Sequence, residues 1–196
     1  MMELLLAAIM FCATQGGSQV YAGPKSLGPF RIDRDVSMDS LFERLGRPPK
    51  LTGDTYCYRS ADRRAFLVLT RMVDVYDARV AGDLVLSGFP NCLDRPVQVT
   101  AQDLASWRTE GSIGLGADVE DVRKAYGRPS REDKVEETNF RWVIQGDFKD
   151  NHYSNEKRPE IGDTVLVYGG APHDLRIAEF GIRQRRVVWI SISKNE

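Results

Sequence analysis

Histidine and cysteine are scarce in this sequence, and it has no surplus of either charge. The 196 residues include two histidines, three cysteines, 28 acidic and 27 basic residues, so the formal net charge is −1. Chains that bind nucleic acid usually show a strong basic excess, so the balance of charge argues against that class. His152, His173 and the cysteines show no spacing typical of a zinc site. We therefore expect no nucleic-acid partner, no metal and no cofactor.

Sequence motifs of common hydrolases are also missing. The chain contains neither Gly-x-Ser-x-Gly nor His-Glu-x-x-His. Glycines precede a predicted helix in GSIGLGAD at 111–118, but the Gly-Lys-Ser/Thr ending of a phosphate-binding loop is absent. The sequence therefore predicts no catalytic residues and a protein that is not an enzyme.

No apolar run reaches the ~20 residues that a helix needs to span a bilayer. The run at 4–13 is short, and small residues follow it up to Ala22. This pattern is typical of a secretory signal peptide, so we predict cleavage after Ala22 and no stable membrane insertion afterwards. Two alternatives stay open. Cys12 would carry a lipid in a lipoprotein, although Phe11 precedes it where a small residue is usual. The segment would otherwise form a buried N-terminal helix.

Export to the periplasm or the medium changes the role of the cysteines. Cys57 and Cys92 remain after cleavage, and two cysteines in an exported chain favour one disulfide. The closed loop would stabilise the fold by roughly 3–4 kcal/mol in the chain-entropy model. The sequence also predicts two structural units, and the bridge would attach the segment that connects them to the sheet of the first unit. It would thereby fix the angle between the two units.

The chain repeats one turn, as LGRPPK at 45–50 and YGRPSR at 126–131. Apolar residues at helical spacing precede each turn: Met38, Leu41, Phe42 and Leu45 before the first, and Val119, Val122 and Tyr126 before the second. Ser37 and Asp118 stand where helix N-caps belong. Gly46 and Gly127 stand where a left-handed glycine ends a helix. The sequence predicts two equivalent helices.

Short β-branched and aromatic runs follow each turn and read as strands. They are TYCYRS, RRAFLVLTRMV and GDLVLSGF in the first half, and NFRWVIQ, DTVLVY, LRIAEFGI and RRVVWISIS in the second. The predicted fold is α+β: two tandem units, each a short helix or helix pair packed on one face of an antiparallel β-meander. The predicted boundaries are 1–22 for the signal peptide, 23–95 for the first unit and 96–196 for the second.

The run IGLGADVEDVRKAYGRP, an aromatic-x-aromatic strand (FRW) and the final VVWISIS strand resemble the domain of the BamE/SmpA outer-membrane lipoproteins. Two such units in tandem resemble the β-lactamase-inhibitor protein (BLIP) superfamily. The resemblance covers about residues 28–193 as architecture, and the second unit matches better than the first. It implies a non-enzymatic protein–protein interaction in the cell envelope or outside the cell. It identifies no partner-contacting residue in this chain.

Two regions are candidate partner-binding sites. Leu166, Tyr168 and Trp189 would form an aromatic patch if the sheet face that carries them is open. Packing of the two units face to face, or burial of Trp189 in the core, would remove that patch. The 146–162 segment lacks strand signals and carries Asp150, His152 and Tyr153. It is either a protruding contact loop or a solvated hairpin loop.

Two functions of different class fit these observations. The first is an exported, non-catalytic protein-interaction module that inhibits an enzyme or assists envelope assembly. The second is an exported hydrolase or small-ligand binder that uses the groove between the units, with 146–162 as a lid. A carboxyl group with a strongly raised pKa in a deep pocket would favour the second. A shallow concave sheet surface without groups of perturbed pKa would favour the first.

Overall fold

The computed structural model describes residues 23–34, 36–48, 54–71, 80–92, 96–134, 162–169 and 176–194. The helices are α1 (Met38–Leu45), α2 (Val119–Tyr126) and the 3₁₀ turn η1 (Leu104–Ser106). The strands are β1 (Ser26–Leu27), β2 (Phe30–Arg31), β3 (Thr55–Ser60), β4 (Phe66–Arg71), β5 (Ala81–Ser87), β6 (Val97–Thr100), β7 (Arg131–Lys134), β8 (Thr164–Gly169), β9 (Arg176–Arg183) and β10 (Arg186–Lys194). The predicted mixture of short helices and strands is confirmed.

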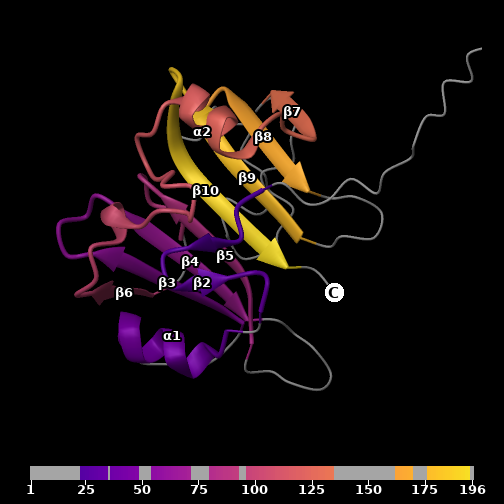
Figure 1. Cartoon of the computed structure of the whole chain (residues 1–196). Coiled ribbons are helices and arrows are strands. Elements are labelled where there is room, and N and C mark those ends of the chain that lie inside the picture. Colours follow the sequence, from indigo (N-terminus) through magenta and orange to yellow (C-terminus); the bar gives the residue numbers. More distant parts are fainter. Residues whose placement is uncertain are drawn as a thin grey trace, which may run out of the picture.

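One sheet of eight strands runs through the described part of the chain in the order β6-β3-β4-β5-β10-β9-β8-β7 (Figure 1). Strands β3, β4 and β5 form one antiparallel meander, and β8, β9 and β10 form another. The two meanders join edge to edge, because β5 pairs with β10 in antiparallel fashion. The predicted halves therefore share one continuous sheet and do not pack face to face.

Both helices cover the same face of this sheet. The predicted apolar stripes of α1 and α2 are buried in one core cluster together with strand side chains. Phe42 of α1 meets Tyr56 of β3 edge-on, with ring centroids 5.0 Å apart. Tyr126 of α2 packs on Tyr168 of β8 and Phe180 of β9, with centroids 5.9 Å apart in both pairs. Helix α1 thus lies over the first meander and α2 over the second (Figure 1).

The helix ends match the predicted positions but differ in detail. Asp118 caps α2 by accepting a hydrogen bond from the backbone N–H of Glu120 at 3.0 Å, as predicted, whereas Ser37 makes no such side-chain bond. Gly46 and Gly127 follow the helices with φ of 93° and 75°. Their ψ values of 135° and −153° lie outside the left-handed helical region, where ψ is about 47°. Both residues adopt a conformation that is essentially restricted to glycine.

The same tyrosine hydrogen bond closes both helix ends. The hydroxyl of Tyr58 donates to the carbonyl oxygen of Gly46 at 3.1 Å, and the hydroxyl of Tyr168 donates to that of Gly127 at 3.2 Å. If YCY of the first half is aligned with FRW of the second, Tyr58 corresponds to Trp142, which lies outside the described part of the chain. In the second half, the hydrogen bond to the glycine carbonyl comes from a tyrosine that follows the glycine by 41 residues. In the first half, the tyrosine follows the glycine by 12 residues.

Some elements carry no signal that the sequence analysis recognised. Strand β6 pairs with β3 in parallel. Its sequence, VQVT, is too short to give a clear strand signal. Strand β7 is the charged tetrapeptide REDK, and β1 and β2 form a separate two-residue ladder. The sequence AQDLASW at 101–107 predicts a short second helix capped by Thr100, but this segment forms only the 3₁₀ turn η1. Thr100 instead ends β6, and its hydroxyl accepts a hydrogen bond from the N–H of Gln102.

Candidate interaction surface

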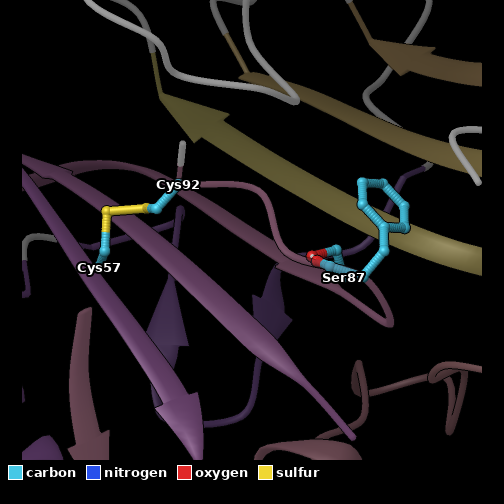
Figure 2. Close-up of a disulfide and its surroundings, with 4 residues drawn as sticks. Cys57, Ser87 and Cys92 are labelled. Carbon is cyan, nitrogen blue, oxygen red and sulfur yellow. A yellow bond between two sulfur atoms is a disulfide. The ribbon is translucent and has the colours of Figure 1, made fainter. Parts of the chain in front are cut away.

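The predicted disulfide joins Cys57 of β3 to Cys92, which lies in the segment that leaves β5 (Figure 2). The two Cα atoms are 6.2 Å apart, within the range that a disulfide permits, so the prediction is confirmed. The bridge anchors the crossover that brings β6 beside β3. It does not set the relative placement of the two halves, because the β5–β10 ladder does so over the pairs from Ser87↔Trp189 to Asp83↔Ser193.

Strand alternation gives the sheet two faces, which we call the helix face and the disulfide face. Tyr56 and Tyr58 belong to the core beneath α1, and Cys57 lies between them on the opposite face, as predicted. One register row then crosses the whole sheet on the disulfide face: Val97, Cys57, Val68, Val85, Ser191, Glu179, Val167 and Arg131. Residues from both halves therefore share this face.

The aromatic patch predicted from Leu166, Tyr168 and Trp189 does not exist as one exposed surface. Leu166 and Tyr168 lie on the helix face beneath α2, with exposed fractions of 0% and 1%. Trp189 lies on the disulfide face and is 1% exposed. Alternation along the final strand predicts Val188, Ile190 and Ile192 together on the core side; Ile190 and Ile192 do lie in the core, whereas Val188 does not.

A β-bulge explains the misplaced residue. The register of β10 against β9 shifts between Val187 and Trp189, and an extra residue there reverses the alternation on its N-terminal side. Val187 consequently joins the core on the helix face, and Val188 packs against the disulfide-face cluster. Alternation read from sequence cannot anticipate a bulge.

Trp189 is buried because its cross-strand neighbour is glycine. Gly181 pairs with Trp189 across the β9–β10 ladder, and a Cβ atom at position 181 would overlap the indole ring. The ring therefore lies over bare backbone and completes a second apolar cluster on the disulfide face. That cluster contains Phe89, Val165, Val167 and Trp189, with Ile177 and Val188 packed against it.

Two carboxyl groups that the sequence analysis did not select occur on the same face. Asp83 of β5 pairs with Ser193, and Glu179 of β9 pairs with Ser191, so both lie on the disulfide face, on either side of β10. Burial raises the pKa of Asp83 to about 6. Burial is also the main cause that raises the pKa of Glu179. No hydrogen bond or ion pair joins either carboxyl group to a described residue.

Glu179 lines a surface cavity of about 290 Å³ at the β7–β9 end of the sheet. The other lining residues are Ser130, Arg131, Val167, Gly169 and Ile177. The guanidinium group of Arg131 is paired with Asp133 at 2.6 Å, so its charge is already compensated. Glu179 is the one acidic residue of the RIAEFGIR strand, and its neighbours in the strand are apolar. An acidic side chain is unusual among apolar strand residues, so this position was the sequence signal for the site.

A second cavity, of about 420 Å³, borders the loop before α2 and includes Gly111, Ser112, Asp121 and Lys124. This loop contains the glycine-rich GSIGLGAD segment. The carboxylate of Asp118 already occupies the start of α2, with Glu120 and Asp121 in the first turn. These acids oppose an anion at the helix N-terminus, which agrees with the sequence argument against a phosphate site.

Some predicted features lie outside the described residues. They are the signal peptide at 1–22, the strand NFRWVIQ, and the loop candidates Asp150, His152 and Tyr153. Among the residues that the structure does describe, no group of three or more His, Cys, Asp or Glu side chains is arranged to hold a metal ion. No helix in the described ranges is long and apolar enough to cross a membrane.

Comparison with protein-family models, with curated proteins and with solved structures finds no match for this chain.

Proposed function

We propose that this chain is an exported, non-catalytic protein-interaction module made of two tandem BamE/BLIP-like units. The observation that carries the proposal is the make-up of the disulfide face. Both α-helices cover the opposite face, whereas this face carries the half-buried apolar side chains of Ile177 and Val188 and the half-buried carboxyl groups of Asp83 and Glu179. Apolar groups beside charged groups that lack an ion-pair partner are typical of a surface that binds another protein.

The repeated helix ends support the tandem-unit part of the proposal. Each helix ends at a glycine of positive φ, and each glycine carbonyl accepts a tyrosine hydroxyl from a strand of the following meander. Aligning Tyr58 with Tyr168 gives the second unit 29 more residues than the first between the glycine and the tyrosine. Strand β7 belongs to this insertion, which we propose to be the feature that distinguishes the two units.

The disulfide supports export. Cys57 and Cys92 form a bridge, and such bridges persist mainly in oxidising compartments. Together with the signal-peptide pattern at 1–22, this supports a site of action in the periplasm or outside the cell, where the proposed partner is another protein.

The alternative function is an exported small-ligand binder or hydrolase, and Glu179 is the observation that favours it. A carboxyl group whose pKa is raised by burial and that lines a cavity is a candidate functional group. The cavity does not lie between the two halves, where the sequence analysis expected a groove, because β5 and β10 are hydrogen-bonded there. Among the described residues that line it, the other charged one, Arg131, is already ion-paired.

Capture followed by reconstitution tests the proposal. The exported chain, immobilised through its C-terminus, is exposed to envelope and secreted fractions of its source, and each captured protein is then purified separately. We expect one of them to form a saturable complex with the purified chain, and any hydrolysis in the mixture to belong to the partner. If no captured protein rebinds and the chain alone turns over a small substrate, the alternative function replaces the interaction module.

A further inference from the structure

On the basis of the proposed interaction function, we infer that the cavity at Glu179 receives a basic side chain, best an arginine, of the partner protein. The cavity lies at one end of the sheet, where β7, β8 and β9 run side by side (Figure 1). Its volume of about 290 Å³ lies just below the roughly 300–1,000 Å³ of sites for drug-sized ligands. An arginine side chain is smaller than such a ligand and fits within this volume.

The walls of the cavity suit the aliphatic stem of such a side chain. Val167 and Ile177 project from the same sheet face as Glu179 and contribute apolar surface. Lysine and arginine bury their methylene stems against apolar surface while the charged head reaches a polar group. Here the carboxyl group of Glu179 is that polar group, since it pairs with Val167 across the β8–β9 ladder and follows Ile177 by two residues on β9.

The charge of the cavity requires a cation. Glu179 is largely removed from water, and no described residue donates a hydrogen bond to it. A carboxylate in that position is costly unless a positive group compensates it. Arg131 weakly favours the ionised form of Glu179, but Asp133 opposes that effect and holds the guanidinium group of Arg131. The compensating charge must therefore come from outside the described residues.

A second acceptor makes arginine the better match. The Oγ atom of Ser130 accepts a hydrogen bond from the N–H of Gly169 at 3.2 Å, and a hydroxyl oxygen has two lone pairs. One lone pair is left for an incoming donor. A guanidinium group has five N–H donors in a fixed plane and pairs with a carboxylate in bidentate fashion. It would use both acceptors, whereas an ammonium group presents a more compact charge.

N-acetyl-argininamide is a direct probe, and N-acetyl-citrullinamide is its uncharged control. Both are titrated into isotope-labelled protein while the backbone amides of β7–β9 and the side-chain carboxyl carbon of Glu179 are followed by NMR. We expect saturable shifts confined to the cavity with argininamide, a lower apparent pKa of Glu179 at saturation, and at least ten-fold weaker binding of citrullinamide. Equal shifts with both probes, or shifts spread over the whole surface, would overturn the inference.

Two matched variants complete the test. Glu179→Gln removes the charge without changing the shape and should weaken argininamide binding at least ten-fold. Asp83→Asn removes another half-buried carboxyl group of the same face, which does not line the cavity, and should leave binding unchanged. Unfolding in urea verifies that both variants are folded. Equal losses in the two variants would indicate general electrostatic attraction and contradict a specific site.

The reconstituted partner complex separates this inference from the proposed function. Glu179→Gln should weaken that complex at least ten-fold, and Asp83→Asn should weaken it less than two-fold. A complex that forms equally well with Glu179→Gln would overturn the inference and leave the interaction function standing. Failure of every captured protein to rebind would remove the interaction function, while the argininamide titration would still decide whether the cavity selects a guanidinium group.

Discussion

The indole ring of Trp189 lies on the bare backbone of Gly181, its direct partner across the β9–β10 ladder. This pairing lets the largest side chain of the disulfide face lie flat and become buried with Val165 and Val167. The apolar cluster next to the Glu179 cavity therefore depends on the absence of a side chain at position 181.

Gly181→Ala should destabilise the protein by about 1–3 kcal/mol, because the added methyl group meets the ring of Trp189 and forces repacking. In a Trp189→Ala background the same change should cost close to nothing. Urea unfolding of the two single variants and the double variant forms a double-mutant cycle. An equal cost of Gly181→Ala in both backgrounds would show that the ring isn't what excludes a side chain at this position.

Gly46→Ala and Gly127→Ala should each cost about 1–3 kcal/mol, because both positions need a positive φ with extended ψ. Steric overlap is not the reason: the nearest atom to a Cβ at position 46 is 3.9 Å away, and none lies within 4 Å at position 127. Gly88 is the control, since its φ is not positive and its nearest contact would be 3.7 Å. Gly88→Ala should change the free energy of unfolding by less than about 0.5 kcal/mol.

Removing the disulfide with Cys57→Ala/Cys92→Ala should lower the free energy of unfolding by roughly 3–4 kcal/mol, the chain-entropy value for a 35-residue loop. Hydrogen exchange locates the effect. The amides of β6 should lose protection first, since the bridge anchors the crossover that holds β6 beside β3. The β5–β10 amides should keep theirs, because a ladder independent of the bridge joins those strands. Loss of protection at the β5–β10 junction before β6 would contradict this assignment.

Asp83 should make the protein less stable as the pH rises from 4 to 7. Burial raises its pKa to about 6, whereas the unfolded chain titrates near 3.9. The folded state therefore binds this proton more tightly. The resulting stabilisation is complete below about pH 4 and is lost as the pH rises through about 6.

Asp83→Asn should consequently raise the free energy of unfolding at pH 8 by about 1–3 kcal/mol and leave it nearly unchanged at pH 4. Urea unfolding of the variant and its parent at both pH values measures the difference. Glu43→Gln, an exposed position on α1, is the control and should show no such pH-dependent gain. A variant that is less stable than the parent at pH 8 would mean that ionised Asp83 has a favourable partner.

Local patterns predicted the elements well. The apolar stripes of α1 and α2, the strand signals of β3, β4, β5, β8, β9 and β10, and the glycines that end both helices all lie where the sequence placed them. Each of these features depends on the intrinsic geometry of a few neighbouring residues. The disulfide was predictable for a different reason, because only two cysteines follow the predicted cleavage site.

The candidate surface was much less predictable. Sequence alternation grouped Trp189 with Leu166 and Tyr168, but these side chains point to opposite faces of the sheet. The assignment depended on which face the helices cover, on the bulge next to Val188 and on the cross-strand glycine. Each of these depends on residues that are distant in sequence.

The sequence by itself determined the two α-helices, the strands of the two meanders, where the helices end and which cysteines pair, because those outcomes follow from short-range periodicity, backbone sterics and simple counting. Tertiary structure alone decided that the two meanders join through β5 and β10 and that both helices cover one face. It also placed Glu179 and Asp83 on the other face without a compensating charge from any described residue. Strand pairing and burial depend on contacts between residues up to about 110 positions apart, such as Asp83 with Ser193, and no local pattern encodes those contacts.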